Sequence, residues 1–276
     1  MAKKPFRKSK NKSGKPSDKA VPTYDLGRIK SVEKKVAGES SVDGIRLNKY
    51  VANAGICSRR EADVLIADGR ITVNKKVMKV MGYKVQPADT VAYDGTIITR
   101  EKIVYVLLNK PKGFITTMDD PKERKTVMDL VKKACDERIY PVGRLDRNTT
   151  GLLLFTNDGT LAKRLTHPTH QVRKIYQILL DKPITEEHFQ QIEQGITLED
   201  GAVKVEKIAL LSPDALSLGL EITIGKNRIV RRIFEHLGYE VVKLDRTVYA
   251  GLTKKDLPRG KWRYLAEKEV IRLKHF

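Results

Sequence analysis

Apolar residues recur first with helical and then with strand periodicity along this chain, and the two periods predict its secondary structure. A first helix is predicted from one apolar face made of Leu47, Tyr50, Val51 and Ala54. A second helix is predicted to begin at Ser58, because Ser58 and Glu61 have the spacing of a capping box, and to end at Gly69. Residues 71–77 are typical of a strand pair around an Asn74–Lys75 turn. Together these elements predict a small compact unit of two helices and a curled sheet.

The rest of the chain mixes longer apolar runs with one amphipathic helix. Residues 104–108 and 151–156 are continuous apolar runs, which indicate buried strands. Residues 172–179 and 216–224 are also predicted strands, and the second alternates apolar with polar residues. A two-faced helix is predicted at 230–237, with an apolar stripe on one side and arginines on the other. This mixture favours the α+β fold class.

The charge of the chain indicates a polyanionic partner. The chain has 276 residues, of which 40% are hydrophobic, and a formal net charge of +20. Lys and Arg release the counterions condensed on phosphates, so this excess favours nucleic acid. No run approaches the roughly 18 apolar residues of a membrane span. The basic N-terminus is followed by no apolar segment of a secretory signal, and two cysteines give no disulfide framework. We therefore expect a cytoplasmic protein with no membrane partner.

Three regions are expected along the chain. Residues 1–35 hold 12 Lys/Arg and 3 Asp/Glu and show almost no apolar periodicity. Residues 1–43 are therefore predicted to be a disordered basic arm, which either adds RNA affinity or only keeps the chain soluble. Residues 44–101 are the small unit, and residues 102–276 are the larger α+β unit.

The loop between the two buried apolar runs carries the candidate chemistry. Asp146 stands between Arg144 and Arg147 in a polar stretch that enters a hydrophobic strand. Neighbouring guanidinium groups favour the ionised carboxylate, which can act as a nucleophile or as a general base. The residues alone leave these two roles open, and they equally allow an aspartate that only anchors the loop by hydrogen bonds.

The small unit resembles a known RNA-binding module. The resemblance is carried by Ile45–Val51, Gly55, Ser58–Ala62, Leu65–Ile66, Gly69 and Val73–Asn74. It is to the module first described in ribosomal small-subunit protein four, the ribosomal protein S-four type. In such modules the second helix and the hairpin contact the RNA backbone, which implies phosphate contacts at Arg59, Arg60, Arg70 and Lys75. Each of these four is otherwise an ordinary solvated charge.

A second resemblance covers about residues 44–270. The run Val142–Gly159, with Leu108–Gly113 before it and His167–Pro168 after it, closely resembles the signature of the RsuA/RluB-type ribosomal pseudouridine synthases. This resemblance implies that Asp146 is the essential catalytic residue. It also implies a catalytic domain of two subdomains on a mainly antiparallel sheet, with the active cleft between them.

The same resemblance implies supporting roles for other residues. Tyr176, in a Lys-x-Tyr stretch, is implied to pack on the target base, although it is otherwise an ordinary half-buried strand tyrosine. The segment Gly225–Phe234 resembles a motif in which a basic residue pairs with the catalytic aspartate, and we expect Arg231 in that role, with Arg228 second. Arg228, Arg231 and Arg232 share a helical face suited to phosphates, or simply to solvent. Further RNA contacts are expected at Lys110, Arg144, Arg147, Arg228 and Arg232.

The implied reaction needs neither a metal nor a cofactor. His167 and His170 have no carboxylate or cysteine at ligand spacing, and no G-x-G-x-x-G or Walker loop occurs. The predicted function is isomerisation of a specific uridine in ribosomal RNA by a monomer. The run 148–156 resembles the large-subunit enzymes more, which favours 23S over 16S rRNA. The alternatives are a non-catalytic RNA-binding ribosome-assembly factor and a duplex-DNA-binding protein, and no pair of recognition helices supports the latter.

Overall fold

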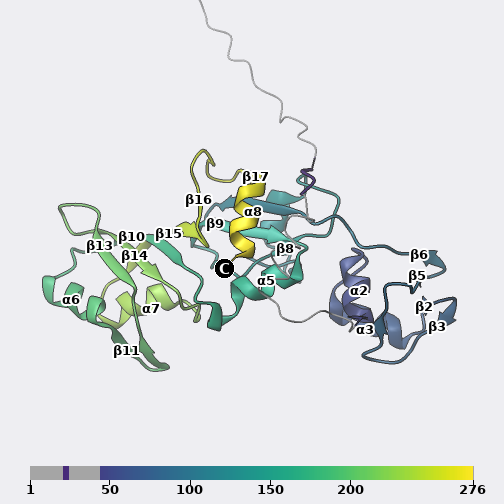
Figure 1. Ribbon diagram of the computed structural model, residues 1–276. Helices are drawn as coiled ribbons and strands as arrows, with labels where there is room; N and C mark the ends of the chain where they lie inside the picture. Colours follow the sequence, from purple (N-terminus) through teal and green to yellow (C-terminus); the bar gives the residue numbers. More distant parts are fainter. Residues whose placement is uncertain (1–20, 25–43, 276) are drawn as a thin grey trace, which may run out of the picture.

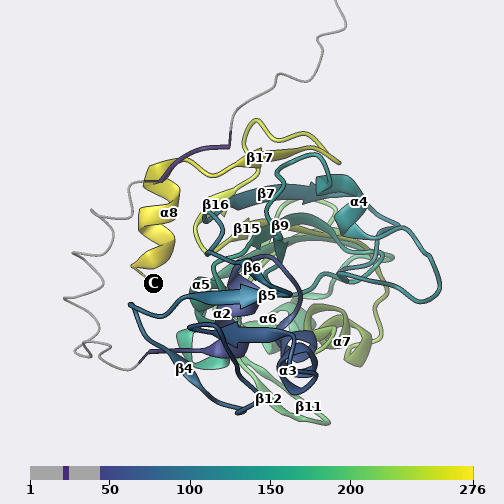
Figure 2. The same ribbon diagram turned by 90° about the vertical axis from the view of Figure 1, so that its right-hand side faces the viewer.

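The protein is built from three parts that lie in a row (Figure 1). The computed structural model describes residues 21–24 and 44–275. Residues 44–101, called the N-terminal module here, lie at one end of the row. The other two parts are the two halves of one large sheet. Figure 2 views the row from the end where the module lies.

The helices of the N-terminal module form as the sequence predicts. Helix α2 (Leu47–Asn53) packs on helix α3 (Arg59–Ala67). The capping box is present, because the Glu61 amide donates to Ser58 Oγ at 3.3 Å and the Ser58 amide donates to the Glu61 carboxylate at 2.7 Å. The apolar faces of both helices are buried in a core of their own, which includes Leu47, Val51, Ala62 and Ile66.

The module also contains a four-stranded sheet with a tight hairpin. Its strand order is β3 (Lys76–Val77), β2 (Ile71–Val73), β5 (Val91–Tyr93), β6 (Thr96–Ile97), and β1 (Ile45–Arg46) pairs separately with β4 (Lys84–Val85). The hairpin turns at Asn74 and Lys75, whose φ angles of 51° and 66° are both left-handed, as a two-residue turn of this hand requires. Asn74 Oδ1 accepts from the Thr90 amide at 2.9 Å, which holds the turn in place. Lys75 therefore adopts a conformation that glycine usually supplies.

The large sheet has nine strands and one parallel junction. Its main path runs through β13 (Lys207–Leu210), β14 (Ser217–Ile222), β10 (Lys174–Leu180), β15 (Val241–Tyr249), β9 (Thr150–Thr156), β7 (Tyr105–Lys110) and β17 (Trp262–Tyr264). Strands β8 (Tyr140–Pro141) and β16 (Leu252–Thr253) pair at its sides. Only β15 and β9 run parallel in the part of the chain that the structure describes, so the expectation of a mainly antiparallel sheet is confirmed.

Each half of the sheet has its own apolar core. Helices α6 (Glu186–Gln194) and α7 (Ile229–His236) pack on β10, β13 and β14, next to the hairpin β11 (Ile196–Leu198) and β12 (Gly201–Val203). In the other half, α5 (Gly159–Thr166) and α8 (Glu267–Lys274) share one core with β7 and β9, while α4 (Val127–Val131) packs in a different core of the same strands. Because both faces of β7 and β9 are covered, these strands are continuous apolar runs in the sequence.

Gly151 lets the two halves meet. A Cβ atom at Gly151 would lie 2.3 Å from the Arg246 carbonyl oxygen and 2.5 Å from the Arg246 nitrogen. Its φ is +105°, a conformation that side chains disfavour. Strand β15 can therefore approach β9 this closely only because residue 151 has no side chain.

A short N-terminal segment, Val21–Tyr24, packs against the large sheet. Tyr24 is 7% exposed, its ring lies edge-on to Tyr105 at 5.2 Å, and its hydroxyl donates to the Leu265 carbonyl at 3.0 Å. The expectation of one disordered arm over residues 1–43 is therefore wrong at these four residues. The rest of that arm lies outside the described residues.

Within the described residues, no helix is both long and apolar enough to cross a bilayer.

Candidate active site

A cleft of about 660 Å³ opens where the two halves of the large sheet meet. We call it the central cleft. Its walls come from the loop that precedes β9, from the start of β10, from the segment that leads into α7, and from β15. The cleft therefore lies over the β9–β15 junction at which Gly151 has no side chain. Asp146, Tyr176 and Arg228, which are far apart in the sequence, all line it.

Asp146 lies on a loop whose backbone is fixed by hydrogen bonds from neighbouring side chains. Its side chain is exposed to the cleft. The preceding residue, Leu145, is buried, and its carbonyl accepts from Thr116 Oγ1 at 2.7 Å. No ion pair reaches the Asp146 carboxylate from the residues that the structure describes, so it remains available to a ligand.

Lys110 holds this loop, although we expected it to contact RNA. The side chain is fully buried at the end of β7. Its ammonium donates to the carbonyl oxygens of Thr149 at 2.8 Å, Asp146 at 3.0 Å, Pro111 at 3.2 Å and Arg147 at 3.3 Å. Burial lowers the pKa of Lys110 to about 8, and the charge of Asp146 opposes that shift. The expected RNA contact is therefore wrong, because the only polar atom of this side chain is used inside the protein.

Tyr176 and Lys174 come from the same strand and line the same cleft. Tyr176 is 8% exposed, so its ring forms part of the cleft wall and little of it reaches solvent. The Lys174 ammonium donates to the Thr223 carbonyl at 2.7 Å and to the Val172 carbonyl at 2.8 Å. Burial lowers the pKa of Lys174 to about 8, and the positive charge of Arg246 lowers it further.

Arg246 is the cleft residue that sequence reasoning missed. It lies on β15, is 3% exposed, and donates through Nε to the Leu152 carbonyl at 2.8 Å. Its guanidinium lies 4.3 Å from the centre of the Tyr249 ring. Its Nη2 atom is buried and has no hydrogen-bond partner among the described residues, and the same is true of Thr149 Oγ1 in the cleft. Unpaired buried donors are costly, so these two atoms are candidates for contact with a bound ligand.

Arg231 does not lie in the central cleft, contrary to expectation. It is half-buried on α7, and its Nη1 atom donates to the Val241 carbonyl at 2.7 Å. The side chain therefore connects α7 to the start of β15. Helical periodicity predicted that Arg231 shares a face with Arg228 and Arg232. Its hydrogen bond to the carbonyl at the start of β15 instead holds the side chain outside the cleft lining.

Asp245, next to Arg246 on β15, fixes the parallel junction. It accepts from Thr150 Oγ1 at 2.7 Å and from Arg259 at 2.8 Å, and it pairs with Lys254. Burial alone would raise the pKa of Asp245, but these hydrogen bonds outweigh burial and lower it to about 2. The carboxylate thus stays charged and connects β15 to the end of the Asp146 loop.

The remaining expected RNA contacts fall in different places. Arg144 and Arg228 line the central cleft, and Arg147 is exposed beside it, with Nε 3.4 Å from the Gly113 carbonyl. Arg232 pairs with Asp200 on the β11–β12 hairpin, and Arg228 pairs with Glu235.

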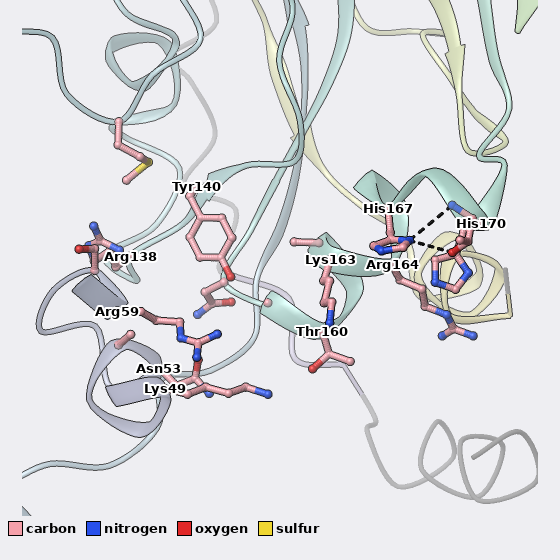
Figure 3. A pocket seen from close by; sticks show the side chains of 17 residues that line it. Lys49, Asn53, Arg59, Arg138, Tyr140, Thr160, Lys163, Arg164, His167 and His170 are labelled. Carbon is pink, nitrogen blue, oxygen red and sulfur yellow. Dashed lines mark hydrogen bonds between the residues drawn. The ribbon is translucent and has the colours of Figure 1, made fainter. Parts of the chain in front are cut away.

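On the N-terminal module, Arg60 and Lys75 are exposed, and Arg70 pairs with Asp94. Arg59 faces a separate hollow of about 980 Å³ between the module and α5, which we call the module groove (Figure 3). The structure therefore brings together only part of the expected set in one place. No group of three His, Cys, Asp or Glu residues that could hold a metal occurs in residues 21–24 and 44–275.

Comparisons with known proteins follow the same division of the chain. Residues 104–236 match the family model described as RNA pseudouridylate synthase, and residues 45–91 match the S4 domain. The chain is 43% identical over 233 residues to "Ribosomal large subunit pseudouridine synthase B" of Bacillus subtilis (strain 168), covering 83% of this chain and 95% of that protein.

Two further proteins match over most of the chain. "Dual-specificity RNA pseudouridine synthase RluF" of Escherichia coli (strain K12) is 38% identical over 232 residues, covering 83% of this chain and 78% of that protein. A solved structure described as "Crystal structure of pseudouridylate synthase" superposes with a TM-score of 0.58 at 28% identity, over 83% of this chain and 100% of the other. The likeness thus includes the N-terminal module as well as both halves of the large sheet.

Proposed function

We propose that this chain, which belongs to the RNA pseudouridine synthase family, converts a specific uridine of 23S ribosomal RNA into pseudouridine. Membership confirms the family resemblance carried by Val142–Gly159, and the S4 match confirms the resemblance of the N-terminal module. The choice of 23S rRNA rests on the relative named as a large-subunit enzyme, which is 43% identical to this chain. We further propose that the chain acts as a monomer in the cytoplasm.

The observation that carries the proposal is the exposed carboxylate of Asp146 in a cleft that also contains Tyr176 and Arg246. The reaction breaks the bond between N1 of uracil and C1′ of the ribose, turns the base, and joins C5 to the same C1′. N1 gains a proton and C5 loses one, so the reaction is balanced without a co-reactant. Asp146 serves either route that the residues allow, by attacking the sugar or by assisting formation of a glycal.

Arg246 is our choice for the basic partner of Asp146, in place of Arg231. The buried guanidinium of Arg246 supplies a fixed positive charge inside the central cleft, and its Nη2 atom has no hydrogen-bond partner among the described residues. Such a charge stabilises negative charge as it develops on the detached base. Tyr176 provides the apolar wall on which the base packs. The uridine must leave its stack to reach this position, which costs a few kcal/mol.

Contacts to the RNA backbone offset that cost. We propose Arg144, Arg147 and Arg228 as contacts close to the target, since two of them line the central cleft and the third is exposed beside it. Arg59, Arg60, Arg70, Lys75 and Arg232 are proposed as contacts farther away. Because Arg70 and Arg232 have carboxylate partners, they must exchange Asp94 and Asp200 for phosphate when RNA binds.

The test is to incubate the full chain with unmodified 23S and 16S rRNA and to map pseudouridine at nucleotide resolution. We expect modification at one uridine of 23S rRNA by the wild type and none by Asp146→Asn, which should bind the RNA as the wild type does. Full activity of Asp146→Asn would refute the role of this residue. If the wild type bound rRNA but formed no pseudouridine in it, the chain would be a binding factor rather than an enzyme.

A matched pair of variants tests the choice of arginine. Arg246→Met should lower kcat about 100-fold or more, because it removes a preorganised charge from the reacting centre. Arg231→Met should leave kcat nearly unchanged. The opposite ranking would return the role to Arg231.

A further inference from the structure

The module groove is a second hollow that the proposed reaction does not use. It opens between helices α2 and α3 of the N-terminal module and helix α5 of the catalytic domain, and its volume is about 980 Å³. Figure 3 shows Lys49 and Arg59 on the module side, with Lys163 and Thr160 on the α5 side. Two domains therefore contribute to a single lined space.

The charges around the module groove are all of one sign. Its lining contains five Lys or Arg side chains and no Asp or Glu, and the five are Lys49, Arg59, Arg138, Lys163 and Arg164. Like charges that converge on a hollow repel one another, so this arrangement is unfavourable until an anion enters.

None of these five cations has an anionic partner among the described residues, in contrast to Arg70 and Arg232. Arg164 is different, because its Nη1 atom donates to the Lys274 carbonyl at 2.9 Å and so connects α5 to α8. The side chains of the other four, Lys49, Arg59, Arg138 and Lys163, form no hydrogen bond or ion pair within the described residues and are free to bind an incoming anion; Lys49, Arg59 and Lys163 come from helices α2, α3 and α5.

The module groove and the central cleft are neighbouring hollows that share one wall residue. His167, at the end of α5, lines both spaces. Its ring nitrogen Nδ1 lies 2.8 Å from Thr169 Oγ1, which holds the imidazole over the short helix Pro168–His170 (Figure 3). Asp146, at the site of the target uridine, is the only acidic side chain in the two linings, so RNA that passes His167 toward the module groove would meet no other carboxylate of these linings.

We propose that the module groove binds the sugar–phosphate backbone of the ribosomal RNA next to the target uridine, and that Lys49, Arg59 and Lys163 contact its phosphates. This inference rests on the proposed function. It adds helix α5 of the catalytic domain, which the sequence analysis did not include, to the elements that contact RNA. Neither domain forms the groove by itself, because its lining comes from both.

The test compares a groove variant with a matched surface variant. The groove variant combines Lys49→Gln, Arg59→Gln and Lys163→Gln. The control combines Lys207→Gln, Lys243→Gln and Lys255→Gln, which are exposed lysines outside both spaces. Both remove three positive charges, and melting temperatures equal to that of the wild type would show that both are folded.

The substrates are two fragments of 23S rRNA that contain the mapped uridine, one with long flanking helices and one trimmed to the shortest fragment that the wild type modifies. On the long fragment, the groove variant should bind about 10- to 100-fold more weakly at physiological salt, and the slope of log K against log salt should be smaller by about 2 to 3. Turnover at saturating RNA should match the wild type. On the trimmed fragment, the loss of affinity should be much smaller.

Equal affinities and equal slopes for the groove and control variants would overturn the inference. So would an equal loss on both fragments, because the groove would then not hold the flanking RNA. These results are distinct from failure of the proposed function, in which the wild type itself would form no pseudouridine.

Discussion

Replacement of Gly151 by alanine tests whether the close approach of β15 to β9 supports the active site. The added Cβ atom would lie 2.3 Å from the Arg246 carbonyl oxygen and 2.8 Å from its carbonyl carbon, so one strand must move. Backbone strain at a φ of +105° costs about 1–3 kcal/mol, and overpacking adds about 1–3 kcal/mol. We therefore expect Gly151→Ala to lower the free energy of unfolding by about 2–6 kcal/mol.

Gly195→Ala is the matched control for this prediction. Gly195 has a φ of +106°, but its added Cβ atom would meet its nearest neighbour at an ordinary 3.5 Å. Gly195→Ala adds backbone strain but no overpacking, so it should lower the free energy of unfolding by only about 1–3 kcal/mol. Chemical denaturation of both variants measures the difference, and pseudouridine formation should fall further in Gly151→Ala because Arg246 is displaced. Equal losses of stability in the two variants would show that the strand contact at residue 151 is not tight.

Four other changes have measurable consequences. Lys110→Met should lower the free energy of unfolding by at least ~2 kcal/mol in denaturation experiments, since the loop carbonyls lose a charged donor; unchanged stability would contradict the buried network. Tyr24→Ala should cost roughly 2–3 kcal/mol by the same measurement, from a buried ring and one hydrogen bond, and no change would mean that the segment does not dock in solution. Asp200→Asn should strengthen RNA binding about two- to fivefold in a titration, because Arg232 is released from an exposed ion pair, and weaker binding would refute the exchange of Asp200 for phosphate. RNA affinity should fall as pH rises through about 8, because the positive charge at the central cleft decreases there: burial lowers the pKa of Lys174, which lines the cleft, and of Lys110, behind the Asp146 loop, to about 8, and both ammonium groups lose their charge above it. The fall should be smaller in Lys174→Arg, and an identical pH profile would exclude Lys174 as its cause.

Local patterns in the sequence predicted the elements that depend only on near neighbours. The capping box at Ser58 and the hairpin at Asn74 form from residues a few positions apart, and both are present. The apolar runs at 104–108 and 151–156 indicated buried strands, which the structure places at 105–110 and 150–156, because burial on both faces leaves a continuous apolar run. The family resemblance added Asp146 and Tyr176, which the structure places in one cleft.

Features set by distant contacts could not be predicted in the same way. Arg246 lies two residues after the buried Leu244 on β15, but an arginine is ordinarily expected at an exposed position, and only the fold shows that the Leu152 carbonyl and the Tyr249 ring surround it. Lys110 has the sequence of a basic surface loop, and only the fold shows that carbonyls of another segment surround it. Arg231 has the periodicity of a cationic helix face, but the Val241 carbonyl sets its direction.

Residues 21–24 contact a part of the chain that is synthesised much later. The Tyr24 hydroxyl donates to a carbonyl 241 residues farther along, at Leu265. During synthesis the N-terminal end emerges first, and at roughly 5–20 residues per second its binding site is completed many seconds later. Until Leu265 has been made, residues 21–24 lack the partner of the Tyr24 hydrogen bond, so this segment can dock only after the strands and the C-terminal part that bind it have been synthesised.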